Sequence, residues 1–497
     1  MAAVYTASLC GVHNPTLSRM TRVGRLNTTR KAPVARNQFT TVKNVMDNSR
    51  QPAFDVIIAG GGLAGLFLAI CLIRNGMNVV VLEKTKQYRP LGGPIQLASN
   101  GLGVVHAISP ELAESIYSVS RPFWGTRSGI RDGLTSEWMF TFDAITDIPA
   151  TQGMPFSICI DRSDLQAALL DEIDRICTQK ASVVRLDAAV AKYIEMEAGV
   201  HVTLENGEIL YGDLLVGADG IWSTIRSQMF GEPSNSVEER FAAASFTGFK
   251  LFSGLPLCKS DEFLEIGYSA FIGPDHYFVV CPDRFGRVQW YAFIKATPQE
   301  PEVANAKTML TKTFANWAPQ VKELILATKE DEIVQRDLLD RVPSISKSWA
   351  SSYVTLLGDS CHATMPNIGQ GTGLAFEDGY VLASMLSDIA SQSEIPRLLQ
   401  KFYKTRILRT AIVQGLGRLN SEAIKLLTPL LPIRPVVDFM LSPMLPSIFY
   451  LQFAYCYSFC PVKIPSDVSK KRAAAMEKRH RYETEQAWND DSNHGIS

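Results

Sequence analysis

Three glycines near the start of the chain have the spacing of a phosphate-binding turn. Gly60, Gly62 and Gly65 follow the mostly apolar run Phe54–Ala59 and lead into the helix-forming run Leu66–Arg74. In such a strand–turn–helix unit the first glycine allows a tight turn, the second lets backbone approach a pyrophosphate, and the third lets the helix pack on the strand. The unpaired N–H groups and the dipole at the helix N-terminus then attract the phosphate charge.

An acidic residue extends this pattern. A second apolar run, Asn78–Leu82, ends at Glu83. This acid stands about 20 residues beyond the glycines, where a carboxylate can bond an adenosine ribose. A glycine-rich turn that binds no ligand would leave Glu83 unexplained. The two features together predict a dinucleotide site at the end of a βαβ unit.

Two later motifs place acids after strand-like runs. Asp219 follows the run Leu214–Gly217, and Asp359 follows the run Val354–Gly358. Beyond the second acid the chain has three more glycines, which are Gly369, Gly371 and Gly373. In this order and spacing, the three motifs resemble those of the flavoprotein monooxygenases with the fold of p-hydroxybenzoate hydroxylase.

This resemblance implies FAD as the cofactor. It implies that Asp359 contacts the flavin ribityl chain, and that the helix opened by Gly369, Gly371 and Gly373 points its N-terminus at the isoalloxazine. That end of a helix stabilises negative charge on reduced flavin. Arg162 stands between a strand-like run and a helical run. It resembles the family arginine near the flavin's phosphates or ribityl chain.

Two polar residues of these motifs have more than one interpretation. Asp219 either caps the turn that follows it or lies near both FAD and the NAD(P)H path of the family. His362 resembles a common family residue beside Asp359, and we expect a structural role for it rather than acid–base catalysis. Because oxygen transfer from flavin needs no protein nucleophile, we predict no catalytic residue of that kind and no catalytic triad.

Segments outside the cofactor motifs resemble the zeaxanthin epoxidases. They are the runs Gly93–Asn100, Gln289–Phe293, Gln335–Asp337 and Thr355–His362. The resemblance implies epoxidation of the ring double bond of a xanthophyll, from zeaxanthin to antheraxanthin or violaxanthin, through a C4a-hydroperoxide formed from reduced FAD and O₂. It also implies electrons from reduced ferredoxin or NADPH.

The chain departs from the plant zeaxanthin epoxidases in three places, of which one is the run Gly371–Ala375 that follows Gln370. The loop Tyr88–Gly93 is rearranged, which leaves Arg89 without a basis for a cofactor contact. Plant members carry a C-terminal forkhead-associated domain, whereas a charged helical tail, Lys470–Glu485, stands near Ser497 here. We therefore expect that domain to be missing.

Composition limits the partners. Lys and Arg number 49 against 50 Asp and Glu, which gives no electrostatic case for nucleic acid. The nine cysteines include no Cys-x-x-Cys pair, so we expect no metal site and a reducing compartment.

Residues 1–50 are rich in Arg, Ser and Thr, with no acid before Asp47. This is typical of an organelle transit peptide, although a disordered basic tail is an alternative. With the resemblance, it predicts the chloroplast.

The C-terminal region is unusually apolar. Between Arg434 and Lys463 the only charge is Asp438, and prolines interrupt the region so that its longest unbroken piece is Ser447–Cys460. That piece is shorter than the ~20 residues of a membrane-spanning helix. Its aromatic content predicts an interfacial helix on a thylakoid or envelope membrane, with a core-packing helix as the alternative.

The fold class expected is α/β, with a Rossmann-like FAD-binding domain, an inserted antiparallel β-sheet substrate domain and a helical C-terminal region. We divide the chain into a transit peptide (1–50), a first FAD-binding part (54–230), a substrate sheet (231–335), a last FAD-binding part with helices (336–427), and an apolar segment with a charged tail (428–497). We expect a helix at Ser163–Ile176 capped by Ser163, a hairpin at Asn206-Gly207 and an irregular stretch at Thr85–Pro155.

Three other functions remain open on the sequence. One is an aromatic hydroxylase that uses NAD(P)H on a soluble phenol, although the apolar C-terminal region argues against it. Another is an alkene reductase of similar fold, such as geranylgeranyl reductase, which would not depend on O₂. The third is a flavoprotein that binds carotenoid without catalysis.

Overall fold

The computed structural model describes residues 56–89, 93–177, 183–233, 236–343, 345–388, 391–427 and 445–464, with scattered residues between 467 and 485. The predicted transit peptide lies outside the described residues, and so does the 428–444 part of the predicted apolar segment.

A five-stranded parallel sheet carries the predicted motifs at one edge. Its order is β18 (Val354–Leu356), β12 (Leu214–Gly217), β1 (Val56–Ala59), β2 (Val79–Leu82) and β8 (Val184–Arg185). β1, β2 and β12 are buried along their whole length, as apolar strands covered on both faces are. Ala59 pairs with both Leu82 and Gly217, and Gly217 pairs with Leu356. These four strands therefore end level with one another, and the residues that follow them meet at one edge.

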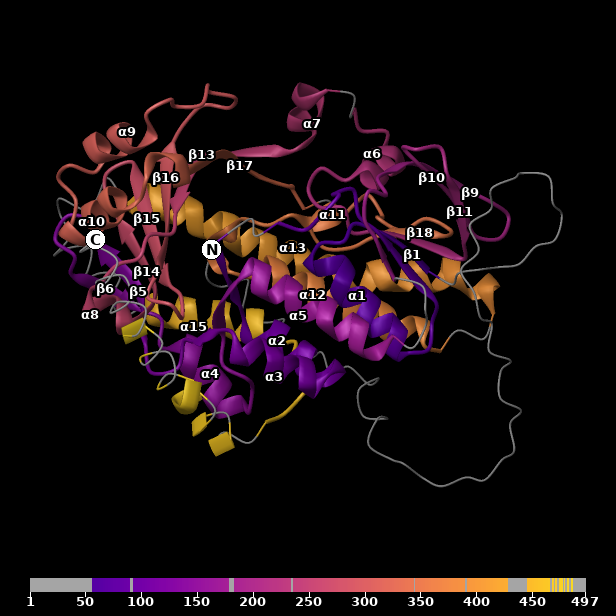
Figure 1. Ribbon diagram of the computed structural model, residues 1–497, viewed down its shortest axis with the longest axis horizontal. Helices are drawn as coiled ribbons and strands as arrows, with labels where there is room; N and C mark the ends of the chain where they lie inside the picture. Colours follow the sequence, from indigo (N-terminus) through magenta and orange to yellow (C-terminus); the bar gives the residue numbers. More distant parts are fainter. Residues whose placement is uncertain are drawn as a thin grey trace, which may run out of the picture. The chain divides into compact units, whose positions relative to one another are not determined.

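Helices and a small sheet cover the parallel sheet. α1 (Leu63–Arg74) packs against both α12 (Gly371–Leu386) and α5 (Arg162–Ile176) (Figure 1). An antiparallel sheet of β9 (Val190–Glu195), β10 (Val200–Leu204) and β11 (Ile209–Gly212) shares the same hydrophobic core. Short helices follow two of the parallel strands, α6 (Thr224–Phe230) after β12 and α11 (Asp359–His362) after β18.

The second large sheet has seven strands and is mixed. Its order is β17 (Val334–Asp340), β13 (Ser245–Gly254), β16 (Val288–Lys295), β15 (His276–Pro282), β14 (Ile266–Ile272), β5 (Arg127–Asp132) and β6 (Trp138–Thr141). The β5–β14 pairing is parallel, whereas the other pairings are antiparallel. The expected antiparallel sheet is therefore present, and it becomes mixed because two strands from an earlier part of the chain complete it.

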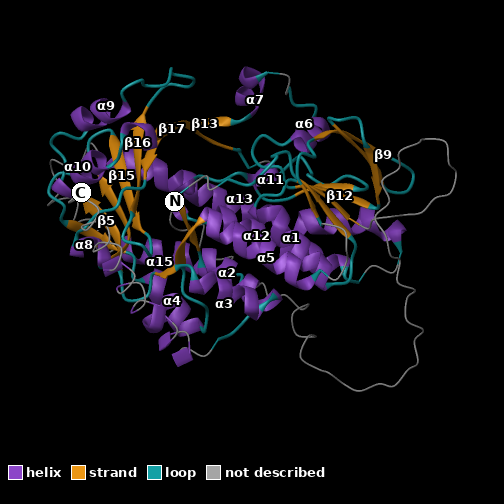
Figure 2. Cartoon of the chain, in the orientation of Figure 1, coloured by secondary structure: helices purple, strands orange, loops and turns teal. Residues whose placement is uncertain are grey.

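The two faces of this sheet pack against different partners. On one face, α9 (Ala306–Thr313) and α10 (Pro319–Ala327) join an aromatic core that includes Phe278 and Trp290. The other face packs against Met365, between α11 and α12. Figure 2 shows the strands in two groups, with α1, α12 and α13 (Ile395–Leu427) between them. Two short helices, α7 (Val237–Ala243) and α8 (Asp261–Leu264), flank β13.

The stretch predicted to be irregular, 85–155, contains regular elements where it is described. They are β3 (Pro94–Leu97), α2 (Ser99–Ile108), α3 (Pro110–Ser118), β4 (Arg121–Pro122), β5, β6 and α4 (Ala144–Gln152). The prediction was wrong because the glycines of α2 are sites of close approach rather than helix breakers. A Cβ on Gly101 would lie 3.0 Å from the Cα of Gly373, and one on Gly103 would lie 2.3 Å from Cys460 Sγ.

The predicted hairpin is confirmed and the predicted cap is not. β10 and β11 pair antiparallel around Gly207, whose φ of +86° suits the turn. Helix α5 begins at Arg162 with Asp161 at the N-cap position, so Ser163 lies inside the helix. The Asp161 side chain does not cap the helix because it pairs with Arg287 at 2.5 Å.

The C-terminal helices pack against helices from earlier parts of the chain. α13 contacts α12, and α15 (Leu445–Tyr457) contacts α4 and α2. Phe453 of α15 is buried, and Phe449 packs on Phe142 with ring centroids 4.9 Å apart. Across the described residues, no helix combines the length and the apolar character that crossing a membrane requires.

Candidate active site

The three glycines of the β1–α1 turn serve three different purposes. Gly60 has φ of +109°, and a Cβ there would lie 2.4 Å from the Ala218 carbonyl oxygen. A Cβ on Gly65 would lie 2.0 Å from the Gly60 oxygen, so Gly65 is required by the packing of helix on turn. Gly62 is the N-cap of α1, and a Cβ there would meet nothing within 4 Å. Gly62 therefore borders open space at a helix N-terminus, where an anion is favoured.

Glu83 reaches from the end of β2 to this turn. Its Oε2 accepts the backbone N–H of Gly61 at 2.8 Å, and its Oε1 accepts that of Thr85 at 2.9 Å. The Tyr88 hydroxyl adds a third hydrogen bond by donating to the Gly61 carbonyl oxygen at 3.0 Å. Each carboxylate oxygen keeps lone pairs for a further donor. The geometry thus gives Glu83 a role in fixing the turn, while its ribose contact stays a prediction.

Asp219 follows β12 at the same edge. Its Oδ2 accepts the backbone N–H groups of Thr224 and Ile225 at 2.7 and 3.3 Å, so it caps the first turn of α6. Its Oδ1 is shielded from solvent and has no hydrogen-bond partner within the described residues. Burial raises the pKa of this carboxyl. The capping interpretation therefore accounts for one oxygen, and the other remains available to a ligand.

Asp359 and Arg162 come together although they are far apart in sequence. Asp359 begins α11 after Gly358, whose φ is +65°. Burial raises the pKa of the Asp359 carboxyl, against the charges of His362 and Arg162, which lower it. Asp359 is nevertheless exposed to solvent, so a bound molecule can reach it. A Cβ on Gly358 would lie 3.1 Å from Ala375 and 3.3 Å from Ala64, so the starts of α1 and α12 converge here.

The glycines before and within α12 have different surroundings. A Cβ on Gly369 would lie 2.5 Å from Gln96 Oε1, and one on Gly373 would lie 3.1 Å from Asn100 Nδ2. The φ of +60° at Gly369 favours glycine there, whereas a Cβ on Gly373 would require only a small shift of the Asn100 side chain. Gly371 is the first residue of α12, where a Cβ would have only the Thr364 hydroxyl as a near neighbour, at 3.2 Å. A contact of these glycines with isoalloxazine stays a prediction.

A buried charge network lies directly behind this edge, and sequence reasoning missed most of it. Asp378 binds His362 Nε2 and Arg406 Nε, both at 2.6 Å. Glu377 binds Arg406 at 2.8 Å and Arg409 at 2.6 Å. Two adjacent acids inside an apolar helix were the available signal, because buried carboxylates require partners. The network gives His362 the structural role expected of it.

His362 is held in its charged form by this network. Burial disfavours the charged imidazole, but Cys361 and Asp378 together outweigh burial and raise the pKa of His362 well above its usual value. Cys361 Sγ lies with these two side chains inside a span of 4.8 Å. This group does not suit a metal ion, because the imidazole and carboxylate bind each other and the positive Arg406 adjoins them.

The side of the seven-stranded sheet that packs against Met365 is apolar. Its buried members are Phe249, Leu251, Ala270, Ile272, Tyr277, Val279, Phe293 and Leu338, with Met365. We call this set the inner face. Tyr277 and Phe293 stack on it with ring centroids 4.1 Å apart. Because Met365 lies three residues beyond His362, the inner face adjoins the edge that carries Asp359.

The site as a whole suits a dinucleotide. It offers a helix N-terminus beside the open space at Gly62, an unpaired oxygen on Asp219, and the accessible carboxylate of Asp359 near Arg162. Gly62, Asp219 and Asp359 follow strands of the parallel sheet, whose level ends bring them together, whereas Arg162 reaches the site from the start of α5, outside that sheet. The fit rests on features that the fold leaves without another function.

The sequence matches the FAD binding domain family over residues 53–414. It is 34% identical over 398 residues to the chloroplastic zeaxanthin epoxidase of Prunus armeniaca, covering 77% of this chain and 57% of that protein. It is 35% identical over 388 residues to the chloroplastic zeaxanthin epoxidase of Solanum lycopersicum, covering 75% and 55%. The chain thus spans a little over half the length of these relatives.

Solved structures share the fold. Klebsiella pneumoniae HpxO, complexed with FAD and uric acid, superposes with a TM-score of 0.64 at 23% identity, covering 83% of this chain and 98% of that one. A salicylate hydroxylase substrate complex gives 0.61 at 21% identity, covering 83% and 98%. At these identities the likeness concerns the fold alone. Taken with the sequence match, which spans most of the chain, it shows that this protein belongs to the family of FAD-binding monooxygenases and that its cofactor is FAD.

Proposed function

We propose that this protein epoxidises the ring double bond of a xanthophyll, converting zeaxanthin to antheraxanthin, violaxanthin or both. The observation that carries the proposal is the apolar inner face beside the candidate site. Its buried members are aliphatic and aromatic side chains and one methionine, which suits a hydrocarbon polyene better than a small polar phenol. The sequence likeness to zeaxanthin epoxidases supports the same substrate.

The residues of the chain bind and orient rather than exchange protons with the substrate. Bound FAD supplies the oxygen-transfer chemistry once it is reduced and supplied with O₂. Gly62 leaves room for the pyrophosphate, Glu83 holds the ribose, and Asp359 and Arg162 hold the ribityl end. The inner face excludes water from the reacting alkene and keeps it in a fixed orientation.

The electron donor and the location belong to the same proposal. Reduced ferredoxin or NADPH supplies the electrons, and the chloroplast is the compartment, as for the chloroplastic relatives. α15 contains no charged residue and exposes Ile448, Tyr450 and Leu451 at 51%, 47% and 60%. This exposed stripe supports peripheral attachment to a thylakoid or envelope membrane, from which the xanthophyll is drawn.

The direct test uses the purified FAD-loaded protein. The protein is incubated in air with zeaxanthin in lipid vesicles and with reduced ferredoxin, or with NADPH alone. The pigments are then separated by chromatography, and their molecular masses are measured by mass spectrometry. We expect one added oxygen atom per epoxidised ring, and no product without O₂. Gly62→Val is the matched control, because we expect it to prevent FAD binding although a Cβ there meets no protein atom within 4 Å. Pigments identical to those of this control would contradict the proposal.

The same assay separates the alternatives. An aromatic hydroxylase would show NADPH oxidation stimulated by a soluble phenol. An alkene reductase would add hydrogen to its substrate without requiring O₂. A carotenoid-binding flavoprotein would bind zeaxanthin and leave it unchanged under every reductant.

A further inference from the structure

A row of apolar residues runs along the outer surface of α13. Leu408, Ile412 and Leu419 are 65%, 37% and 61% exposed, and the exposed Gly415 completes a spacing of four, three and four residues. Residues with this spacing lie on one face of a helix. We call these four residues the α13 stripe. The other side of the helix is buried in the protein, as at Thr410.

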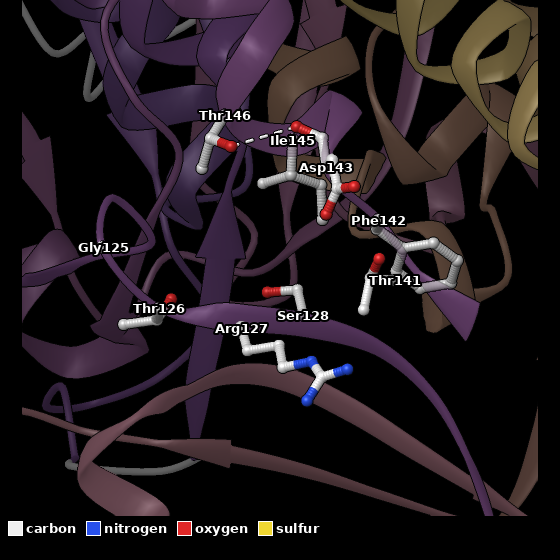
Figure 3. Close-up of a pocket in the computed structure, with 9 residues that line it drawn as sticks. All are labelled: Gly125, Thr126, Arg127, Ser128, Thr141, Phe142, Asp143, Ile145 and Thr146. Carbon is white, nitrogen blue, oxygen red and sulfur yellow. Dashed lines mark hydrogen bonds between the residues drawn. The ribbon is translucent and has the colours of Figure 1, made fainter. Parts of the chain in front are cut away.

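The α13 stripe is the outer face of a helix rather than a cavity. The cavity of about 400 Å³ in Figure 3 is lined by residues around the start of β5 and the β6–α4 junction, and none of them belongs to α13. On the stripe itself, a Cβ on Gly415 would meet no atom within 4 Å. An apolar face without a cavity fits a protein or membrane surface rather than a small molecule.

The spacing of the stripe is the same in both directions along the helix. If a second copy of α13 lies antiparallel over the first, with the two-fold axis midway along the stripe, Leu408 meets Leu419 of the second copy. Ile412 then meets Gly415 of the second copy, so the open space over the glycine receives a branched side chain. Each contact occurs twice, as a two-fold interface requires. The alternation of four and three residues is that of helices that pack lengthwise.

Charges at the two ends of the stripe agree with the antiparallel arrangement. Lys401 and Lys404 are exposed before Leu408, and Glu422 is exposed after Leu419. In the antiparallel pair, Glu422 of one copy lies within about 6 Å, along the helix axis, of both lysines of the other. Opposite charges therefore meet at each end. An anionic membrane would attract the lysines and repel Glu422, so the charges favour a second copy over lipid.

A loop beside α13 adds to the exposed apolar surface. The Tyr403 hydroxyl donates to the Ile345 carbonyl oxygen at 3.0 Å, and Gln414 Nε2 donates to the Arg341 carbonyl oxygen at 2.8 Å. These two bonds hold the loop along the helix. Val342 and Ile345 are 57% and 72% exposed. Apolar side chains are thus exposed beside α13 as well as on it, which enlarges the surface that a second copy can cover.

We propose that the α13 stripe is the centre of a homodimer interface, in which two copies of α13 pack antiparallel about a two-fold axis. Four residues a side are far fewer than the roughly 20–30 a side of a standard interface. We therefore expect a weak dimer that dissociates on dilution. Because α13 carries Arg406 and Arg409, which bind Glu377 of α12, dimerisation would support the helix that holds the buried charge network.

The test is sedimentation velocity of the purified FAD-loaded protein over a range of micromolar concentrations. We expect the wild-type protein to shift from monomer to dimer as its concentration rises. Leu408→Asp should raise the dissociation constant at least about tenfold, because it places a charge in an apolar contact. The substitution is at an exposed residue, so circular dichroism and flavin absorption should not change. A wild-type protein that is monomeric at every concentration would overturn the proposal.

Leu326→Asp is the matched control. Leu326 is a similarly exposed apolar residue, at 56%, and lies on α10. This variant gains the same charge outside the α13 stripe and should dimerise as the wild type does. If it weakens association as much as Leu408→Asp does, the effect belongs to the added charge and the stripe is not the interface.

A double variant tests the antiparallel arrangement. Leu408→Asp and Leu419→Lys should each weaken association. Together they place opposite charges against each other at both ends of the stripe, so the double variant should associate more tightly than either single variant. A double variant no tighter than the single ones would contradict the antiparallel pairing.

The same variants distinguish a membrane from a second copy. Vesicles of phosphatidylcholine and phosphatidylglycerol are sedimented with the wild-type protein and with Leu408→Asp. We expect both proteins to bind these vesicles equally. Release of Leu408→Asp, together with a wild-type protein that stays monomeric in solution, would assign the stripe to the membrane and overturn the dimer.

Discussion

Asp378 and Arg406 form an ion pair inside the protein, with Arg406 Nε 2.6 Å from Asp378 Oδ1 and both side chains only 1% exposed. The pair joins α12 to α13, and the other oxygen of Asp378 binds His362 and the Gly358 N–H, 2.6 and 3.1 Å away. The backbone that presents Asp359 is therefore anchored to a buried network rather than to solvent-exposed groups.

Removing the negative charge at this position should destabilise the fold strongly. Asp378→Asn preserves the size of the side chain but leaves the charge of His362 buried without a carboxylate partner, and leaves Arg406 with Glu377 as its remaining one. Breaking such a pair costs about 3–5 kcal/mol. Urea unfolding should show this loss, and Asp388→Asn, at an exposed acid just beyond the end of α12, should show almost none. Equal unfolding midpoints for wild type and Asp378→Asn would mean that the network contributes nothing to stability.

The His362–Asp378 pair also predicts a pH dependence. Burial lowers the pKa of His362, whereas Cys361 and Asp378 raise it, and the result lies well above 6.5. The stability from this group is therefore fully present below about pH 6.5 and is lost only as pH rises through the raised folded value. Unfolding midpoints of wild type and His362→Gln, measured from neutral to alkaline pH, should converge at the alkaline end. A constant difference over that range would argue against a charged His362.

Gly62→Val should produce a folded protein without flavin. A branched side chain there would occupy the space that we predict for the pyrophosphate, while the protein itself has no atom within 4 Å of the new Cβ. The purified variant should lack the visible flavin absorption and keep its circular dichroism. Gly65→Val, in contrast, should misfold because its Cβ would lie 2.0 Å from the Gly60 oxygen. A yellow Gly62→Val protein would remove this residue from the FAD site.

Asp359→Asn should weaken FAD binding about tenfold or more, since a hydrogen bond to a charged group contributes about 1.5–3 kcal/mol. Burial raises the pKa of this carboxyl, against the charges of His362 and Arg162. The wild-type FAD dissociation constant should therefore increase as pH falls through that raised value. The variant should lack this dependence. Fluorescence titration of FAD at several pH values tests both statements, and an unchanged affinity would show that Asp359 does not hold the cofactor.

Membrane attachment should depend on Leu451 rather than on the aromatic residues first suspected from the sequence. Leu451 is 60% exposed on α15, whereas Phe453 is buried and Phe449 packs on Phe140 and Phe142. Leu451→Asp should release the protein from vesicles and keep its bound FAD. Leu326→Asp, at a residue 56% exposed on α10, should not release it. High salt should leave the wild-type protein attached, because an apolar contact is not screened.

If Leu451→Asp stays on vesicles as well as Leu326→Asp does, the exposed stripe of α15 is not the attachment site. Phe453→Asp provides the contrasting case. It places a charge in the contact between α15 and α4, so it should lower thermal stability whether or not a membrane is present.

Local residue spacing was sufficient to predict several features of this protein. The β1–α1 turn, Glu83 at the end of β2 and the Asn206-Gly207 hairpin each depend on residues that are neighbours in the chain or in one βαβ unit. Short-range steric and hydrogen-bonding requirements decide such features. FAD as the cofactor followed from the resemblance of three such motifs, at Gly60–Gly65, Asp219 and Asp359, to those of the flavoprotein monooxygenases.

Only the tertiary structure decided the remainder, because it depends on partners that are distant in sequence. β5 joins the second sheet through a parallel pairing with β14, a contact across more than a hundred residues that no local pattern specifies. The partners of Glu377 and Asp378 come from α13 and α11. The orientation of α15 could not be predicted, since a helix that is apolar on every side gives no indication of which residues face the core. Packing against α4 determines this orientation, so that Phe453 is buried and Leu451 is exposed to solvent.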